Sequence, residues 1–161
     1  MDYNNRNVRR QDRLLEEENA IMLLRKGEYG ILSLQGEKGG AYGVPVNYVW
    51  DNRNSIYMHC APEGRKLQCI VLCPQVSFCV VGKTRVIADK FTTAYESIII
   101  HGEARIRLVP EERRQALSLL LSKYSPHDKI TGLQYAEKSF YRTEIIRLDI
   151  TEWSGKCKRV K

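Results

Sequence analysis

Short β-type runs follow one another along most of this chain, and tight polar turns join several of them. Residues 29–35 and 41–50 flank a glycine-rich turn at 36–40, and a third run at 55–60 follows the polar turn 51–54. Strands connected by such short turns pair as antiparallel neighbours. The pattern therefore predicts an antiparallel sheet, and closure of that sheet into a small barrel would remove its exposed edges.

The rest of the chain continues this pattern and adds helices. Three further strands are expected, at 75–88, 95–109 and 144–152. Three helices are expected, at 12–26, 62–72 and 110–123. Each helix combines apolar residues at helical spacing with acidic residues or a proline near its start. Residues 125–141 read as irregular or partly helical. The prediction is a mainly β fold with flanking helices, namely a six-stranded antiparallel barrel.

Length and charge narrow the classes of function. The chain has 161 residues, which suits one domain, and 26 Lys and Arg against 19 Asp and Glu give a net charge of +7. The cations gather near both ends, at Arg6, Arg9, Arg10, Arg13, Lys156, Lys158, Arg159 and Lys161. Such runs are typical of solvated tails, or of a surface that binds nucleic acid or a phosphorylated small molecule. Because no nucleic-acid-binding motif accompanies them, we expect no nucleic-acid partner.

Other features indicate a cytoplasmic chain. No apolar run approaches the ~18 residues that a membrane span needs, and residues 1–13 lack the pattern of a secretion signal. The five cysteines are odd in number and lack the spacing of a metal site. We therefore expect free thiols, no membrane association and no bound metal.

The densest group of polar residues lies between the third expected strand and the second helix. His59 ends that strand, and Arg65 and Lys66 fall within the first turns of the helix. A helix N-terminus offers free backbone N–H groups, Arg a two-pronged donor and Lys a point charge, so this segment suits a phosphate. The alternative is that both cations are ordinary surface residues and that His59 is structural.

Three further residues are candidates for ligand recognition. Asn47 interrupts an apolar strand, and its amide both donates and accepts hydrogen bonds, as recognition of a heterocycle edge requires. Ser97 opens a strand and offers a hydroxyl to a phosphate, whereas Trp153 follows the last strand and offers a stacking surface. Each residue also fits an ordinary sheet or core position.

Six short motifs occur in the order typical of one known family. They are RRQDR at 9–13, GVPVNY at 43–48, HCAPEGRKL at 59–67, VSF at 76–78, YESII at 95–99 and GEA at 102–104. In this order they resemble the flavin-binding split-barrel proteins related to pyridoxamine 5′-phosphate oxidase. Among these proteins, the chain is most similar to the 5-nitroimidazole-resistance (Nim) group.

The resemblance implies an FMN-binding split barrel with six strands. Residues 1–161 would form a single flavin-binding domain, with 1–11 as a flexible arm. The protein would be a homodimer with flavin at the subunit interface. FMN is the family's usual cofactor, and FAD is the alternative.

The resemblance also implies roles for the candidate residues. Arg65 and Lys66 would grip the flavin phosphate with help from Ser97, and the strand through Val46, Asn47 and Tyr48 would line the isoalloxazine ring. His59 would contact the flavin and serve as the catalytic residue, whereas Trp153 would come from the partner subunit.

The expected activity follows from this cofactor. The protein would be a flavin-dependent oxidoreductase that reduces a small planar acceptor, such as a 5-nitroimidazole antibiotic, with electrons from reduced flavin. Two alternatives stay open at this point. One is a flavin-binding or flavin-storage protein without turnover, and the other is an oxidase-like enzyme of the same family with another substrate.

Overall fold

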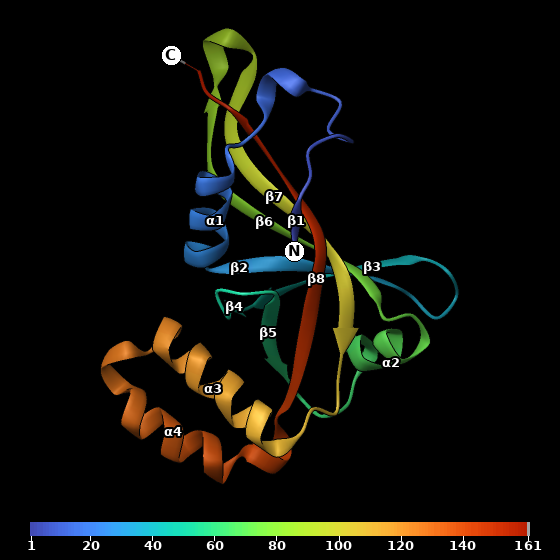
Figure 1. Ribbon diagram of the computed structural model, residues 1–161, viewed down its shortest axis with the longest axis vertical. Coiled ribbons are helices and arrows are strands. Elements are labelled where there is room, and N and C mark those ends of the chain that lie inside the picture. Colours follow the sequence, from blue (N-terminus) through green and yellow to red (C-terminus); the bar gives the residue numbers. More distant parts are fainter. Residues whose placement is uncertain (161) are drawn as a thin grey trace.

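The computed structural model describes residues 1–160 and confirms the mainly β fold (Figure 1). The strands are β1 Asp2–Tyr3, β2 Tyr29–Gln35, β3 Ala41–Asn47, β4 Val49–Trp50, β5 Ser55–Cys60, β6 Gln75–Ile87, β7 Thr92–Arg105 and β8 Glu144–Lys158. The α-helices are α1 Glu17–Lys26, α2 Arg65–Leu72, α3 Pro110–Tyr124 and α4 Lys129–Lys138. Lys161, the last residue of the C-terminal basic run, lies outside the described residues.

The two strands at the ends of the sheet are consecutive in the chain. Its strand order is β3-β2-β6-β7-β8-β5-β4, and β1 adds a short parallel pairing on β8. The strands at the two ends of this order, β3 and β4, are separated only by Tyr48. If β3 and β4 are counted as one interrupted strand and the two-residue β1 is set aside, six strands remain. This is the number that the sequence predicts for a split barrel.

The interruption at Tyr48 has a clear cause in the last turn of α3. The Tyr48 N–H donates to the Tyr124 hydroxyl at 3.0 Å, and the Lys123 ammonium donates to the Tyr48 carbonyl at 2.8 Å. These side chains take the place of ladder partners, because backbone polar groups that are removed from water need other partners. The end of α3 therefore fixes the point where the two ends of the sheet meet.

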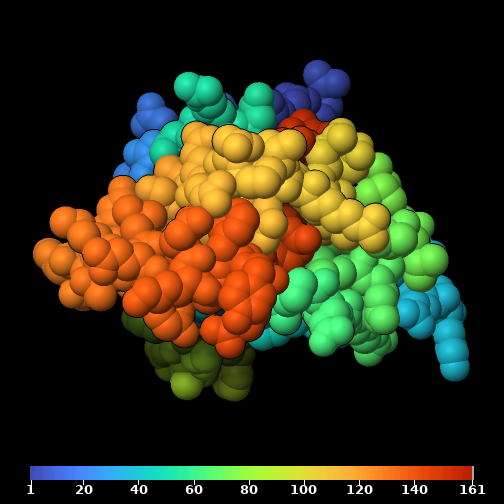
Figure 2. Space-filling view, turned by 90° about the horizontal axis from the view of Figure 1, so that it is seen from below, coloured from blue at the N-terminus to red at the C-terminus, as the bar shows by residue number. Residues whose placement is uncertain are grey.

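The core follows the alternation of the strands. Inward residues such as Leu32, Phe78 and Ile98 are fully buried, and α1 closes one opening with Ala20 and Leu24. A second, smaller cluster lies under α3 and comprises Val49, Ala116, Leu120 and Ile145. Figure 2 shows α3 and α4 covering one end of the molecule, with α2 beside them. None of the helices within residues 1–160 has the length and apolar character to cross a membrane.

Several element boundaries differ from the predictions because of tertiary contacts. The first helix begins at Glu17 rather than at residue 12, since Leu14 pairs with Lys156 and the Leu15 N–H donates to the Gly155 carbonyl. The last strand continues to Lys158 rather than ending at 152, because its second half pairs with the early part of β7. Part of the segment expected to be irregular forms the separate helix α4.

The N-terminal segment that we expected to be a flexible arm lies along β8. The Asn4 N–H donates to the Trp153 carbonyl at 2.8 Å, and the Gly155 N–H donates to Asn5 Oδ1 at 3.1 Å. The two basic ends of the chain therefore lie side by side, and Arg9 and Lys156 line the same hollow.

Candidate functional site

The predicted phosphate site lies where the loop after β5 enters α2. Gly64 has a φ of 128°, a conformation that favours glycine, and an added Cβ there would meet no atom within 4 Å. The first backbone N–H to bond within the helix is that of Leu67, which donates to the Gly64 carbonyl at 3.1 Å. The N–H groups just before it, at Arg65 and Lys66, have no partner inside the helix and remain available to an anion. The helix begins at Arg65, not at 62 as predicted, because of this turn at Gly64.

Two cations stand at this helix start without acidic partners. Arg65 is exposed, and its guanidinium lies 4.3 Å from the centre of the Tyr42 ring on β3. Among the described residues, none of the ion pairs includes Arg65 or Lys66. Stacking on an aromatic ring holds a guanidinium in place but leaves its N–H donors free for an anion. The start of α2 is therefore positively charged, and Tyr42 already holds the Arg65 guanidinium in place.

His59 is close enough to this site for the charge of Lys66 to affect its pKa. It is exposed on β5, where partial loss of water and then the charge of Lys66 lower its pKa. Its imidazole is accordingly neutral at pH 7 and can donate one hydrogen bond and accept another. Burial raises the pKa of the adjacent Cys60 thiol, so this cysteine stays protonated and is a poor nucleophile.

The β3 strand carries an open face beside the site. Tyr42, Val44 and Val46 pack against the core yet stay partly exposed. Asn47 is exposed, and its amide nitrogen donates to the Glu28 carbonyl at 2.9 Å, which holds the side chain at the sheet edge.

The structure corrects what the sequence implied for the Tyr48 side chain. Its ring is fully buried, and its hydroxyl donates to the Leu24 carbonyl at 2.7 Å. Burial also raises the pKa of this phenol well above its usual range. A flavin at the surface cannot reach this ring, so only the backbone of Tyr48 is left to line a ligand.

Ser97 and Trp153 line one hollow, which includes neither Arg65 nor Lys66. Both line a hollow of about 330 Å³ between the N-terminal segment and the outer face of β7 and β8. The Trp153 ring is 1% exposed and packs edge-on against Tyr3, with ring centres 4.7 Å apart. Its ring therefore belongs to the core of its own chain, whereas the Ser97 side chain remains partly exposed.

A comparison with protein families identifies the chain. The family described as pyridoxamine 5′-phosphate oxidase matches residues 16–157. The chain belongs to this family. The resemblance drawn from the six motifs is thereby confirmed, and so is the split-barrel type of fold. A comparison with curated proteins gives no match.

Solved structures of other proteins share this fold at low sequence identity. A proposed 5-nitroimidazole antibiotic resistance protein from Bacteroides thetaiotaomicron superposes with a TM-score of 0.72 at 15% identity, over 90% of this chain and 86% of that one. An FAD- and heme-binding protein from Mycobacterium smegmatis superposes with a TM-score of 0.74 at 16% identity, over 90% of this chain and 72% of that one. An FAD-binding protein from Mesorhizobium loti superposes with a TM-score of 0.64 at 18% identity, over 91% of this chain and 97% of that one.

The predicted flavin cofactor, FMN with FAD as the alternative, is confirmed at the level of this family. The residues at the start of α2 fit the phosphate of such a cofactor. They combine free N–H groups, two unpaired cations and an open glycine turn. A metal site is not indicated, since residues 1–160 contain no cluster of three or more metal-binding side chains.

Sequence reasoning missed two contributors to the site. Tyr42 positions Arg65, and the only local signal for it was the alternation Tyr42-Val44-Val46 in a strand that was already expected. Lys123 holds the β3–β4 junction through the carbonyls of Gly27 and Tyr48, at 2.7 and 2.8 Å. No local signal marked it, because its partners lie 96 and 75 residues away in sequence.

Proposed function

We propose that this protein is a flavin-dependent oxidoreductase that reduces a small planar acceptor such as a 5-nitroimidazole. The observation that carries the proposal is the pair of unpaired cations, Arg65 and Lys66, at the open start of α2 beside the exposed face of β3. In a pyridoxamine 5′-phosphate oxidase family chain, this combination suits a flavin whose phosphate lies at the helix and whose ring lies along the strand.

The proposed roles follow from side-chain chemistry. Arg65 and Lys66 bind the phosphate, and Tyr42 keeps the Arg65 guanidinium in place. The partly exposed edges of Val44 and Val46 offer an apolar surface to the ring system. The side chain of Asn47 is held by Glu28 and so cannot turn away from the strand edge.

We further propose that two copies of this one-domain chain complete the site. Ser97 lines the hollow beside the N-terminal segment, which includes neither Arg65 nor Lys66, so we take Ser97 to assist the flavin phosphate from a second copy. The outer face of β7 supports such a contact, because Ile99 beside Ser97 is 45% exposed. An aliphatic side chain with this exposure gains stability when a partner covers it.

A bound flavin supplies electron transfer. Reduction of a nitro group to a nitroso group consumes two electrons and two protons and releases one water molecule. His59 is neutral at pH 7 and exposed, so it can donate a hydrogen bond to the nitro oxygens as negative charge develops on them. The nearby Lys66 ammonium favours the same charge.

Anaerobic reoxidation tests the proposal. Flavin-loaded protein is reduced with dithionite, freed of excess reductant and mixed with a 5-nitroimidazole while flavin absorbance is followed. We expect reoxidation with two electrons consumed per nitroso product. Removal of one hydrogen-bond donor to developing charge costs about tenfold or more in rate, so His59→Ala should slow reoxidation while flavin remains bound. His127→Ala, at an exposed histidine on the turn Pro126–Asp128, is the matched control.

Two results would lead to other functions. A protein that binds flavin but transfers no electrons to any nitroimidazole would be a flavin carrier, or an oxidase-like enzyme with another substrate. Failure of the protein to take up either FMN or FAD would refute the phosphate site at Arg65 and Lys66 itself.

A further inference from the structure

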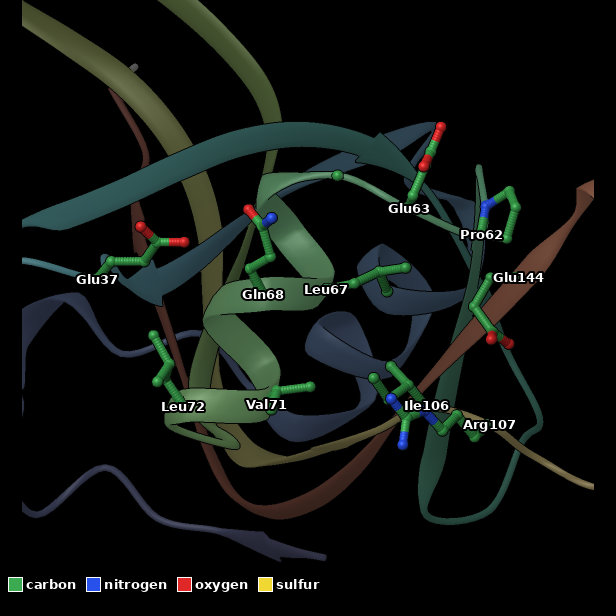
Figure 3. A pocket seen from close by; sticks show the side chains of 11 residues that line it. Glu37, Pro62, Glu63, Leu67, Gln68, Val71, Leu72, Ile106, Arg107 and Glu144 are labelled. Carbon is green, nitrogen blue, oxygen red and sulfur yellow. The ribbon is translucent and has the colours of Figure 1, made fainter.

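A groove of about 660 Å³ runs along α2 from Gly64 (Figure 3). Part of its lining is aliphatic and open to water, since Val71 and Leu72 on α2 are 64% and 63% exposed. Figure 3 shows Ile106 on the side of the groove that faces α2. Neighbouring aliphatic side chains in a hollow gain stability when a partner covers them. The groove therefore suits an apolar group.

The charges around the groove favour a cation over an anion. Three carboxylates line it, those of Glu37, Glu63 and Glu144. Glu144 lies 3.9 Å from the Arg113 guanidinium, but none of the ion pairs within residues 1–160 includes Glu37 or Glu63. Among the described residues that line the groove, Arg107 is the one cation. An occupant that is both apolar and positively charged would match this lining.

The far end of the β6–β7 hairpin has that complementary character. Phe91, at the turn between the two strands, is 97% exposed, and its φ of 47° lies in the left-handed region that bulky residues rarely adopt. Val86, on β6 near the turn, is 75% exposed. The charged residues of the segment 83–91 are Lys83, Arg85, Asp89 and Lys90. We call this segment the hairpin tip; it presents apolar side chains among an excess of cations.

A single copy of the chain cannot bring the hairpin tip to the groove. Figure 1 shows the turn of the hairpin at one end of the molecule and α2 toward the other. The hairpin tip is, however, continuous with the face proposed above for pairing. Strand β7 begins at Thr92, directly after Phe91, and goes on to carry Ser97 and Ile99. A second copy that covers Ile99 therefore lies next to the strand that leads to the hairpin tip.

We infer that the hairpin tip of each copy docks in the α2 groove of a second copy of this chain. Phe91 of one copy would cover Val71 and Leu72 of the other, and the cations of the hairpin tip would face the acids of the groove. The inference rests on the proposed pairing of two copies and adds a contact that needs no flavin. Because each copy has one hairpin tip and one groove, a symmetric pair makes the contact twice.

This occupant explains two features of the chain together. A polyanion or a lipid surface would match the cations of the hairpin tip but would leave the acidic groove without a role. The groove also begins at Gly64, where α2 starts. The hairpin tip of a second copy would therefore form part of the surroundings of the proposed phosphate site, which is complete only in the pair.

Sedimentation velocity of fluorescently labelled protein, over a range of concentrations, measures the dissociation constant of the pair. Phe91→Asn removes the ring and suits the left-handed backbone, and Val71→Lys sets an ammonium against the cations of the hairpin tip. Each variant should raise the dissociation constant about 100-fold or more, because one buried apolar side chain contributes about tenfold and the contact occurs twice. Tyr135→Asn and Ile130→Lys, at exposed residues of α4, are the matched controls and should change the constant by less than about threefold.

A mixture of the two variants tests whether the contact is reciprocal. The mixed pair keeps one intact contact, between the hairpin tip of the Val71→Lys chain and the groove of the Phe91→Asn chain. It should therefore associate about tenfold more tightly than either variant does with itself. Two residues that act at separate interfaces would give no such gain.

The possible failures are distinguishable. A dissociation constant that neither variant raises, or a mixture no tighter than its components, would overturn the docking of the hairpin tip and leave the pairing through β7 in place. A wild-type protein that stays monomeric with flavin bound would overturn both contacts. Uptake of FMN or FAD, titrated separately, reports on the phosphate site in every case, and circular dichroism checks that each variant has folded.

Discussion

The bulge between β7 and β8 offers the sharpest test of how this barrel is held together. At Gly102 the pairing of the two strands shifts register, and the β7 backbone approaches β8 closely. A Cβ atom added at Gly102 would lie 2.2 Å from the Asp149 carbonyl oxygen, whereas real Cβ contacts almost never fall below 3.0 Å. Gly102→Ala must therefore push the two central strands apart by about 0.8 Å at this point.

The cost of this movement can be worked out from the hydrogen bonds of the ladder. A shift of that size takes hydrogen bonds of normal length, about 2.9 Å, beyond their useful range. Loss of two buried ladder bonds at ~1 kcal/mol each, plus the penalty for leaving buried backbone groups without partners, gives about 3 kcal/mol. For a chain of this size, ~3 kcal/mol corresponds to a fall in Tm of about 6–12 °C.

Urea unfolding followed by tryptophan fluorescence measures this effect, because Trp50 and Trp153 are both buried. Gly43→Ala on β3 is the matched control. Its Cβ would meet only Ile31 Cγ2, at 3.5 Å, an ordinary contact. The control should change the free energy of unfolding by less than about 1 kcal/mol, because alanine is favoured over glycine within strands and the added Cβ makes only an ordinary contact. A Gly102→Ala protein as stable as wild type, at equal protein concentration, would refute the reasoning.

Three further predictions concern single side chains. Lys123→Met should lower the free energy of unfolding by about 2 kcal/mol, because it removes the ammonium donor to Gly27 and Tyr48; urea unfolding measures this against the exposed Lys138→Met. Burial lowers the pKa of Lys123 from 10.5 to about 8, so between these values the unfolded chain binds the extra proton and wild-type stability rises with pH. That rise should be missing from Lys123→Met, and parallel pH curves for the two proteins would contradict it. Tyr57→Phe should cost about 1 kcal/mol in thermal unfolding, because Tyr57 donates to Glu112 at 3.0 Å.

The local elements of this fold were predictable because their causes are local. The strand at 29–35 and the strand at 55–60 both appear with the predicted bounds, since alternating residues and adjacent turns define them. The third long helix begins at Pro110 as predicted, because a proline followed by acids favours a helix start. The cationic pair at 65 and 66 was likewise visible in sequence, as a pattern of residue types beside a helix start.

The amino-acid sequence by itself thus determined the order of the helices and strands. It also determined the family to which its motifs point and the residue types of one anion site. Only the tertiary structure decided that the Tyr48 and Trp153 rings face the core, with 0% and 1% exposure. It also decided that the hollow lined by Ser97 includes neither Arg65 nor Lys66, and that a groove runs along α2 from Gly64. The physical reason is that burial and shape arise from contacts between distant segments. Alternation along a strand shows that two faces differ, but the elements that pack against those faces determine which of them meets a ligand.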